Sequence, residues 1–169
     1  KDLASLADIY VNDAFAVSHR GGASLILLPT LLSSYAGFLI EEEINNLSKV
    51  MENPKQPLVV IVGGGKAVDK FAVIKNLYAQ TSKFLIGGVL ANTFLKAKGE
   101  SVGSSVVDAE LLPSVQEFLN DPKVALPVDF IKGEDGKILD LGPDSTEMFS
   151  EEIKKAGTVI WSGPVGYFE

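Results

Sequence analysis

Cysteine is absent from the 169-residue sequence, and histidine occurs only once, as His19. These absences exclude disulfide frameworks, thiol catalysis, zinc fingers and any Ser-His-Asp triad that does not use His19. Positive charge is also scarce, because 15 Lys and Arg residues stand against 22 Asp and Glu residues, giving a formal net charge of −7. A chain without an excess of positively charged residues is not expected to bind nucleic acid.

Long hydrophobic runs are missing as well. No apolar stretch approaches the roughly 20 residues that a membrane-spanning helix needs, and the first residues do not resemble a secretory signal. We therefore expect a cytoplasmic protein with no membrane partner. What the chain does contain is 46% hydrophobic and 22% charged residues, which is ordinary globular usage and enough for a packed core.

The sequence changes character near residue 36. Before it, a β-type run at 9–15 leads into a glycine-rich loop and an apolar segment at 25–32. After it, apolar residues recur at spacings of four, three and four, as on one face of a helix. These residues are Ile40, Ile44, Leu47 and Met51. A helix over 36–53 could connect two lobes or could belong to the core of one domain, and the pattern alone leaves both open.

Beyond Pro57 strands and helices alternate. The pattern predicts strands at 58–62, 84–86, 124–130 and 158–161, and helices at 67–79, from 87 through 95, at 108–119 and at 145–155. This alternation is typical of an α/β fold with a parallel sheet and right-handed crossovers. In such folds ligands bind at the carboxyl ends of the strands, and glycines cluster at those ends here.

The motif Gly63-Gly64-Gly65-Lys66, followed by Lys70, is the strongest chemical signal in the chain. A glycine run lets backbone N–H groups approach a phosphate, a helix N-terminus adds positive potential, and lysines neutralise the remaining charge. The motif matches neither a Walker A loop nor Gly-x-Gly-x-x-Gly. A tight turn between strand and helix with two solvated lysines is the alternative interpretation.

Two weaker signals lie elsewhere. His19-Arg20 could bind phosphate or carboxylate, or could be an ordinary surface pair. Glu169, after the turn at Gly163-Pro164, could accept a ribose hydroxyl, although one carboxylate says little by itself.

Taken together, these motifs resemble phosphoglycerate kinases over essentially the whole chain. The matching blocks, in collinear order, are Asn12-Asp13-Ala14-Phe15 with His19-Arg20, Gly63-Gly64-Gly65-Lys66 with Asp69-Lys70, Gly87-Gly88 with Ala91-Asn92-Thr93-Phe94-Leu95, Leu126-Pro127-Val128-Asp129, and Trp161 through Glu169. The resemblance implies a glycolytic kinase that transfers a phosphoryl group between 1,3-bisphosphoglycerate and ADP, giving 3-phosphoglycerate and ATP, with Mg²⁺ as cofactor.

The resemblance also implies roles for individual residues. Arg20 matches an arginine that binds 3-phosphoglycerate, with His19 beside it, and Lys66 and Lys70 match the lysines of the nucleotide phosphate loop. Arg20, Lys66 and Lys70 are then the catalytic residues. Glu169 matches the glutamate that holds the ribose hydroxyls. The remaining nucleotide-binding positions are Gly64, Gly65, Gly87, Gly88, Gly163 and Pro164.

The fold that the resemblance implies is an incomplete, three-layer, Rossmann-like parallel-sheet lobe, joined by a long helix to the remnant of a second α/β lobe. We expect residues 1–35 to be the tail of an N-terminal substrate-binding lobe, 36–53 the connecting helix and 54–169 part of a C-terminal nucleotide-binding lobe. The parent enzyme is expected to be monomeric, and this central segment alone to be little active. A non-catalytic nucleotide- or anion-binding α/β module is the alternative. A dinucleotide-binding dehydrogenase fold is disfavoured, because the Gly-x-Gly-x-x-Gly motif is not matched.

The chain departs from the family pattern at Ser162, Val89 and Tyr167, where the family usually has Asn, Gly and Val. The segment 130–142 is also shorter than in many relatives. Val89 and Ser162 belong to the expected nucleotide site, so the base preference stays open.

Overall fold

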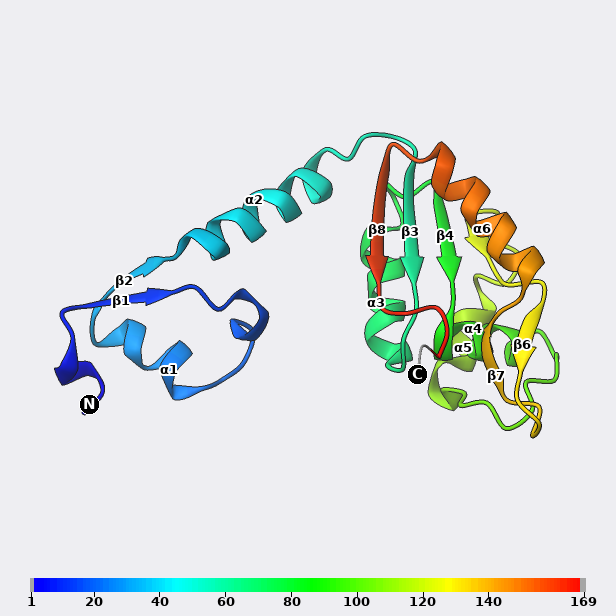
Figure 1. Cartoon of the computed structure of the whole chain (residues 1–169), viewed down its shortest axis with the longest axis horizontal. Coiled ribbons are helices and arrows are strands. Elements are labelled where there is room, and N and C mark those ends of the chain that lie inside the picture. Colours follow the sequence, from blue (N-terminus) through cyan, green and yellow to red (C-terminus); the bar gives the residue numbers. More distant parts are fainter. Residues whose placement is uncertain (1, 168–169) are drawn as a thin grey trace. The chain divides into compact units, whose positions relative to one another are not determined.

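The computed structural model describes residues 2–167, which divide into two compact units with the boundary between Pro54 and Lys55. Each unit is described by itself below, and Figure 1 labels most of the helices and strands. The three-part division into 1–35, 36–53 and 54–169 stays a prediction.

The N-terminal unit consists of short elements and one long helix. In chain order these are η1 (Ala4–Leu6), β1 (Ile9–Asn12), η2 (Phe15–Val17), α1 (Ala23–Ile26), η3 (Leu28–Thr30), β2 (Ser33–Ala36) and α2 (Phe38–Glu52). Strand β1 pairs with β2 in parallel, from Ile9 opposite Ser33 to Asn12 opposite Ala36. The sequence pattern did not predict β2, because residues 33–36 are exposed and carry no alternation of apolar and polar side chains.

Helix α2 begins at Phe38, two residues later than predicted, because 33–36 form a strand and Gly37 is extended. The side chain of Asp13, which lies 26 residues before Leu39 in the sequence, caps the N-terminus of α2. Its Oδ1 accepts the backbone N–H groups of Leu39, at 2.7 Å, and Ile40, at 3.1 Å. The carboxylate therefore satisfies two of the four donors that a helix N-terminus leaves unpaired, and it favours the positive end of the helix dipole.

The C-terminal unit contains a four-stranded sheet of order β5-β4-β3-β8 in which every pair is parallel (Figure 1). Its strands are β3 (Leu58–Val62), β4 (Lys83–Ile86), β5 (Val124–Ala125) and β8 (Thr158–Ser162). Its helices are α3 (Ala67–Leu77), α4 (Gly88–Ala97), η4 (Ala109–Leu111), α5 (Leu112–Gln116) and α6 (Pro143–Lys155). A separate antiparallel pair consists of β6 (Phe130–Lys132) and β7 (Ile138–Leu141). The predicted α/β fold with a parallel sheet is confirmed.

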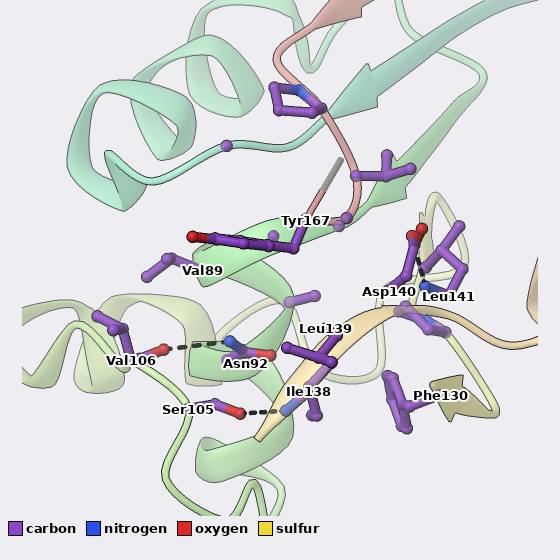
Figure 2. A pocket seen from close by; sticks show the side chains of 18 of the residues that line it. Val89, Asn92, Ser105, Val106, Phe130, Ile138, Leu139, Asp140, Leu141 and Tyr167 are labelled. Atoms are coloured by element: carbon purple, nitrogen blue, oxygen red, sulfur yellow. Dashed lines mark hydrogen bonds between the residues drawn. The ribbon is translucent and has the colours of Figure 1, made fainter. Parts of the chain in front are cut away.

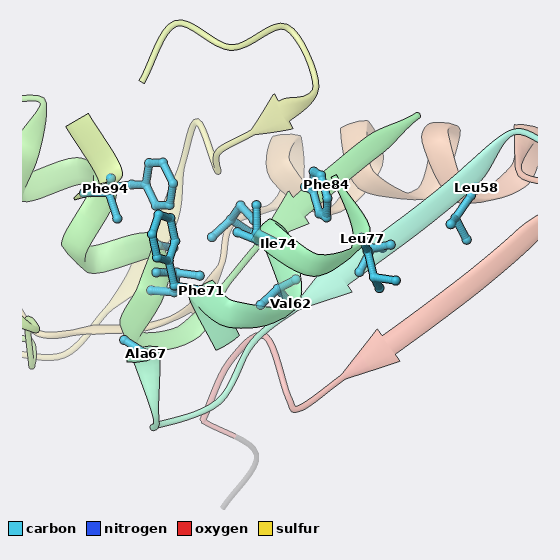
Figure 3. Close-up of a cluster of buried hydrophobic side chains, with 13 residues drawn as sticks. Leu58, Val62, Ala67, Phe71, Ile74, Leu77, Phe84 and Phe94 are labelled. Atoms are coloured by element: carbon cyan, nitrogen blue, oxygen red, sulfur yellow. The ribbon is translucent and has the colours of Figure 1, made fainter. Parts of the chain in front are cut away.

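The core of this unit lies on both faces of the sheet. Every residue of β3 is buried, as the continuous apolar run predicts for a central parallel strand. Leu58, Val60 and Val62 pack with side chains from α3, α4 and α5 (Figure 3). Val59 and Ile61 point the other way and pack with Phe149 of α6. Helices therefore cover both faces of the sheet.

Two predicted elements are shorter than expected. The predicted strand 124–130 ends at Ala125 as β5, because Pro127 has no N–H for a strand ladder, and the chain restarts as β6 at Phe130. The predicted helix 108–119 consists of η4 and a five-residue α5, with only turns after Gln116.

Candidate nucleotide site

Three loops meet where β3, β4 and β8 end. The Gly63 N–H donates to the Ser162 carbonyl at 2.9 Å, and the Gly64 N–H donates to the Pro164 carbonyl at 2.7 Å. The third loop joins them because the Gly88 N–H donates to the Val165 carbonyl at 3.1 Å. The topology of a parallel sheet brings these distant segments to one edge, as predicted.

Glycine is required at two of these positions. Gly88 has φ of +59°, and a Cβ there would lie 2.6 Å from the backbone nitrogen of Gly64. Gly163 has φ of +84°, and a Cβ there would lie 2.6 Å from the carbonyl oxygen of Gly63. Both positions combine the left-handed backbone region with a backbone neighbour that cannot move aside, so only glycine fits.

The glycine run serves a different purpose from the one its sequence suggests. The N–H groups of Gly63 and Gly64 are already used in bonds to the loop after β8, so they are not available to a phosphate. Within residues 2–167 the N–H groups of Gly65 and Lys66 have no acceptor, and α3 has no side-chain cap at its N-terminus. The donors open to an anion therefore begin at Gly65, and the positive end of α3 lies directly behind them.

Lys70 connects this helix to the end of β8. Its Nζ donates a 2.7 Å hydrogen bond to Ser162 Oγ, and its Cε lies 3.8 Å from the point where a Cβ on Gly64 would be. Lys66, the N-cap residue of α3, is exposed, and its Nζ has no hydrogen-bond partner among residues 2–167. Lys66 and Lys70, which are one helical turn apart, thus add two ammonium groups to the unpaired N–H donors at the start of α3.

A cavity of about 330 Å³ lies beside these loops (Figure 2). Glycine backbone forms one side, and aliphatic and aromatic side chains form most of the rest. Its lining residues are Gly64, Gly65, Gly87, Gly88, Val89, Ala91, Asn92, Ser105, Val106, Pro127, Phe130, Lys137, Ile138, Leu139, Asp140, Leu141, Pro164, Val165, Gly166 and Tyr167. A volume of this size holds a planar heterocycle.

Hydrogen bonds hold the cavity wall formed by β7 and the segment after α4. Ser105 Oγ accepts the Ile138 N–H at 2.8 Å, and the neighbouring Ser104 hydroxyl donates to Asp135. The Ser104 bond lowers the pKa of Asp135 below its usual 3.8, and the Lys137 N–H, which also bonds this carboxylate, adds to the effect. The β6–β7 turn is therefore fastened to the segment that follows α4.

The predicted site residues fall into three groups. Gly64, Gly65, Gly87, Gly88 and Pro164 line the cavity, and Gly163, Lys66 and Lys70 belong to the adjoining loops. His19 and Arg20 belong to the N-terminal unit, where both are exposed and neither side chain has a hydrogen-bond partner among the described residues. Glu169 lies outside the described residues.

Sequence reasoning missed most of the cavity's far wall. Residues 137–141 carry no motif, and they reach the cavity only because β6 and β7 form a hairpin that the pattern did not reveal. Ser105 and Val106 gave no signal either. Asn92 and Tyr167 were visible in the matching blocks but were not assigned to the site, whereas Val89 was placed in the expected nucleotide site as a departure from the family pattern.

Residues 2–167 contain no group of three or more His, Asp or Glu side chains that could hold a metal ion. Mg²⁺ commonly binds through substrate phosphates with only one or two carboxylates, so an ion that arrives on a nucleotide suits this donor set. Among the described helices, none is long and apolar enough to cross a membrane.

A family model described as "Phosphoglycerate kinase" matches residues 1–169. Among curated proteins, the phosphoglycerate kinase of Finegoldia magna is 38% identical and covers 100% of this chain, and that of Pseudothermotoga lettingae is 42% identical with the same coverage. This chain covers 49% of each. It therefore spans about half the length of the curated relatives that it matches.

Solved structures give the same result. The phosphoglycerate kinase structure from Coxiella burnetii matches 98% of this chain with a TM-score of 0.82 and 34% identity, and the match covers 49% of that chain. The structure from Pyrococcus horikoshii OT3 matches 97% of this chain with a TM-score of 0.86 and 27% identity, covering 48% of that chain.

Proposed function

The chain belongs to the phosphoglycerate kinase family, and on that premise we propose that its C-terminal unit binds ADP and ATP for phosphoryl transfer. The parent reaction moves a phosphoryl group between 1,3-bisphosphoglycerate and ADP, giving 3-phosphoglycerate and ATP in glycolysis. One observation carries the proposal: an apolar cavity that fits a heterocycle adjoins a loop with open N–H donors and two lysines.

In this proposal the base enters the cavity and the phosphates lie at Gly65, Lys66 and Lys70. Phosphoryl transfer needs little covalent chemistry from a protein, because catalysis comes mainly from positioning the reactants and neutralising charge on the phosphoryl oxygens. Two lysines and a helix N-terminus supply that positive potential. The absence of cysteine and the single histidine are therefore compatible with the reaction.

Mg²⁺ is proposed as the cofactor, bound mainly by the nucleotide's own phosphates. When bound, the ion neutralises phosphate charge. Glu169 is the proposed partner of the ribose hydroxyls, and Ser162, held by Lys70, lies at the edge of the phosphate loop.

Arg20 and His19 are the proposed site for 3-phosphoglycerate. The Arg guanidinium can form paired hydrogen bonds with a phosphate or a carboxylate, and both side chains are exposed. We also propose that the chain is the central segment of its parent: residues 1–35 from a substrate-binding lobe, 36–53 a connecting helix and 54–169 part of the nucleotide-binding lobe. A monomeric, cytoplasmic parent enzyme completes this proposal.

The test is calorimetric titration of the 169-residue chain with Mg·ADP. We expect saturable binding that is lost in Lys66→Ala/Lys70→Ala. The matched control is Lys154→Ala/Lys155→Ala, which removes the same charge from α6, where both ammonium groups pair only with neighbouring glutamates. Equal binding by both double variants, or no binding by the folded wild-type chain, would refute the proposed phosphate loop.

A second assay separates the enzyme from the non-catalytic alternative. Arg20→Ala is expected to weaken binding of 3-phosphoglycerate while leaving Mg·ADP affinity unchanged, because Arg20 belongs to the other unit. Saturable Mg·ADP binding with no measurable affinity for 3-phosphoglycerate in the wild type would favour a nucleotide-binding module without the kinase's second substrate.

A further inference from the structure

We propose that Tyr167 stacks on the base of the bound nucleotide and that Asn92 accepts a hydrogen bond from the base's 6-amino group. The inference rests on the proposed function and adds to it the two residues that recognise the base. It starts from a juxtaposition: an exposed tyrosine ring and an open amide oxygen line the same apolar cavity. Figure 2 shows the ring of Tyr167 on one side of that space, with Val89 and Asn92 on the other.

The backbone of Tyr167 is fixed while its ring stays exposed. The Tyr167 N–H donates to the Leu139 carbonyl at 2.7 Å, which ties this residue to β7. Gly166 fits against the Asp140 carboxylate so closely that a Cβ at Gly166 would clash with Asp140 Oδ1. The side chain of Tyr167 is nevertheless 62% exposed. A large aromatic surface held in place but not packed is an available platform for a planar ligand.

The face of this ring already attracts a cation. Lys137 Nζ lies 5.4 Å from the centroid of the Tyr167 ring, and no other aromatic ring among residues 2–167 stacks on it. Lys137 is also a lining residue of the cavity. The π-face of Tyr167 is thus accessible to a partner from a cavity-lining segment rather than covered by core side chains.

Asn92 supplies the polar contact. Its side chain is 7% exposed, and its Nδ2 donates to the Val106 carbonyl at 3.2 Å, which fixes the orientation of the amide. Asn92 Oδ1 accepts no hydrogen bond from residues 2–167. No side-chain nitrogen or oxygen among these residues is both fully buried and unpaired, so this oxygen keeps accessible surface, on a residue that lines the cavity. An acceptor with a fixed orientation in a mostly apolar cavity favours a ligand edge that donates.

These two residues together predict a base preference. Adenine presents a 6-amino donor to an acceptor, whereas hypoxanthine presents a 6-oxo acceptor at the same place. IDP differs from ADP at the 6-position and in carrying a proton on N1, so the two affinities report on recognition of this edge of the base. Stacking on Tyr167, in contrast, contributes to both nucleotides, because each base has a π-face.

The experiment is calorimetry of the full chain with Mg·ADP, Mg·IDP and Mg·pyrophosphate. Wild type is expected to bind Mg·ADP about tenfold more tightly than Mg·IDP. Tyr167→Val should weaken both nucleotides by about tenfold, while Tyr167→Phe, which keeps the ring, stays within about twofold of wild type. Affinity for Mg·pyrophosphate, which has no base, should be the same in all three chains.

A spectroscopic readout distinguishes stacking from a structural effect. In proton NMR, the H2 and H8 signals of bound adenine should shift upfield in wild type and Tyr167→Phe, and this ring-current shift should be lost in Tyr167→Val. If the wild-type chain binds no Mg·ADP, both the proposed function and this inference are refuted. If Mg·ADP binds but Tyr167→Val matches wild type, or Mg·IDP binds equally well, only this inference is overturned.

Discussion

The two units bury very different amounts of apolar surface. All but one of the buried hydrophobic residues within 2–167 belong to the C-terminal unit, and Ile40 is the exception. In the N-terminal unit, by contrast, Leu6 is 78% exposed and Phe38 88% exposed, and eleven further large hydrophobic residues of this unit are between 48% and 65% exposed. Burial of apolar area is the main favourable contribution to folding, so the C-terminal unit has its own core and the N-terminal unit does not.

The two units are therefore stabilised in different ways. The C-terminal unit has helices packed on both faces of a sheet, while the N-terminal unit relies on one parallel strand pair and on the Asp13 cap of α2. The candidate nucleotide cavity lies wholly within the unit that has a core. A site built from loops needs such a scaffold, because the loops are positioned by the elements they connect.

The sharpest test of the comparison is a pair of phenylalanine truncations. Phe94→Ala, at a side chain with no exposed surface, should lower the free energy of unfolding of the C-terminal unit by about 3–5 kcal/mol. Phe38→Ala should change it by less than about 0.5 kcal/mol. Urea titration followed by Trp161 fluorescence reports on this unit, since Trp161 is the one tryptophan. Similar losses in both variants would contradict the comparison.

A second pair examines the glycine loops. Gly88→Ala places a Cβ against Gly64 in a left-handed conformation, and we expect it to cost about 1–3 kcal/mol of stability and to weaken Mg·ADP binding. Gly65→Ala is the matched control for stability, because a Cβ at Gly65 meets nothing within 4 Å. Thermal unfolding and calorimetry measure both effects. A stable Gly88→Ala chain with wild-type affinity would show that the loops are not packed as described.

A smaller effect is expected in the N-terminal unit. Asp13→Ala removes the acceptor for the first N–H groups of α2 and should destabilise that helix by about 1 kcal/mol. Amide hydrogen exchange in 38–52 should become roughly fivefold faster, with exchange in 58–62 unchanged. Asp8→Ala, which removes an exposed carboxylate from the same unit, is the control. If exchange in α2 does not change, the cap does not stabilise the helix.

The smallest expected effect concerns pH. The Ser145 hydroxyl and backbone N–H bond to Asp129 and lower the pKa of its carboxyl below the usual 3.8. A carboxyl whose pKa is lower in the folded state stabilises it fully above its unfolded pKa. That contribution is lost as pH falls through the lower, folded value.

Ser145→Ala should therefore reduce the difference in melting temperature between pH 7 and pH 3 for the C-terminal unit. Ser150→Ala on the same helix serves as the control, because Ser150 has no hydrogen bond to Asp129 among the described residues. A pH dependence unchanged in Ser145→Ala would show that this bond does not stabilise the carboxylate.

The pattern of apolar residues in the sequence predicted those helices and strands whose burial is regular along their length. The run 58–62 is apolar and β-branched because β3 is buried on both faces, and the periodicity of 67–79 closely predicted α3, which ends at Leu77. The glycines at the strand ends also predicted where the loops meet, because only glycine fits where two backbones approach closely. Pattern failed at β2 and at the β6–β7 hairpin, whose short strands are only partly buried or exposed and carry no clear alternation.

The distribution of burial could not be predicted. Apolar residues of 36–52 have helical periodicity, yet Ile44 and Leu47 are about half exposed within their unit. Periodicity says which residues share a face of a helix, but not whether anything covers that face. The sequence also could not predict which N–H groups of the glycine run are free. Only the structure shows that the Gly63 and Gly64 N–H groups bond to the loop after β8.

We propose that the C-terminal unit binds the nucleotide on its own, between the glycine loops and β7. Hydrogen exchange of the full chain, with and without saturating Mg·ADP, tests it most directly. We predict slower exchange in 63–70, 87–92, 137–141 and 163–167, and no change in 2–54. Protection confined to 2–54, or none in the four C-terminal segments when Mg·ADP is bound, would contradict the claim.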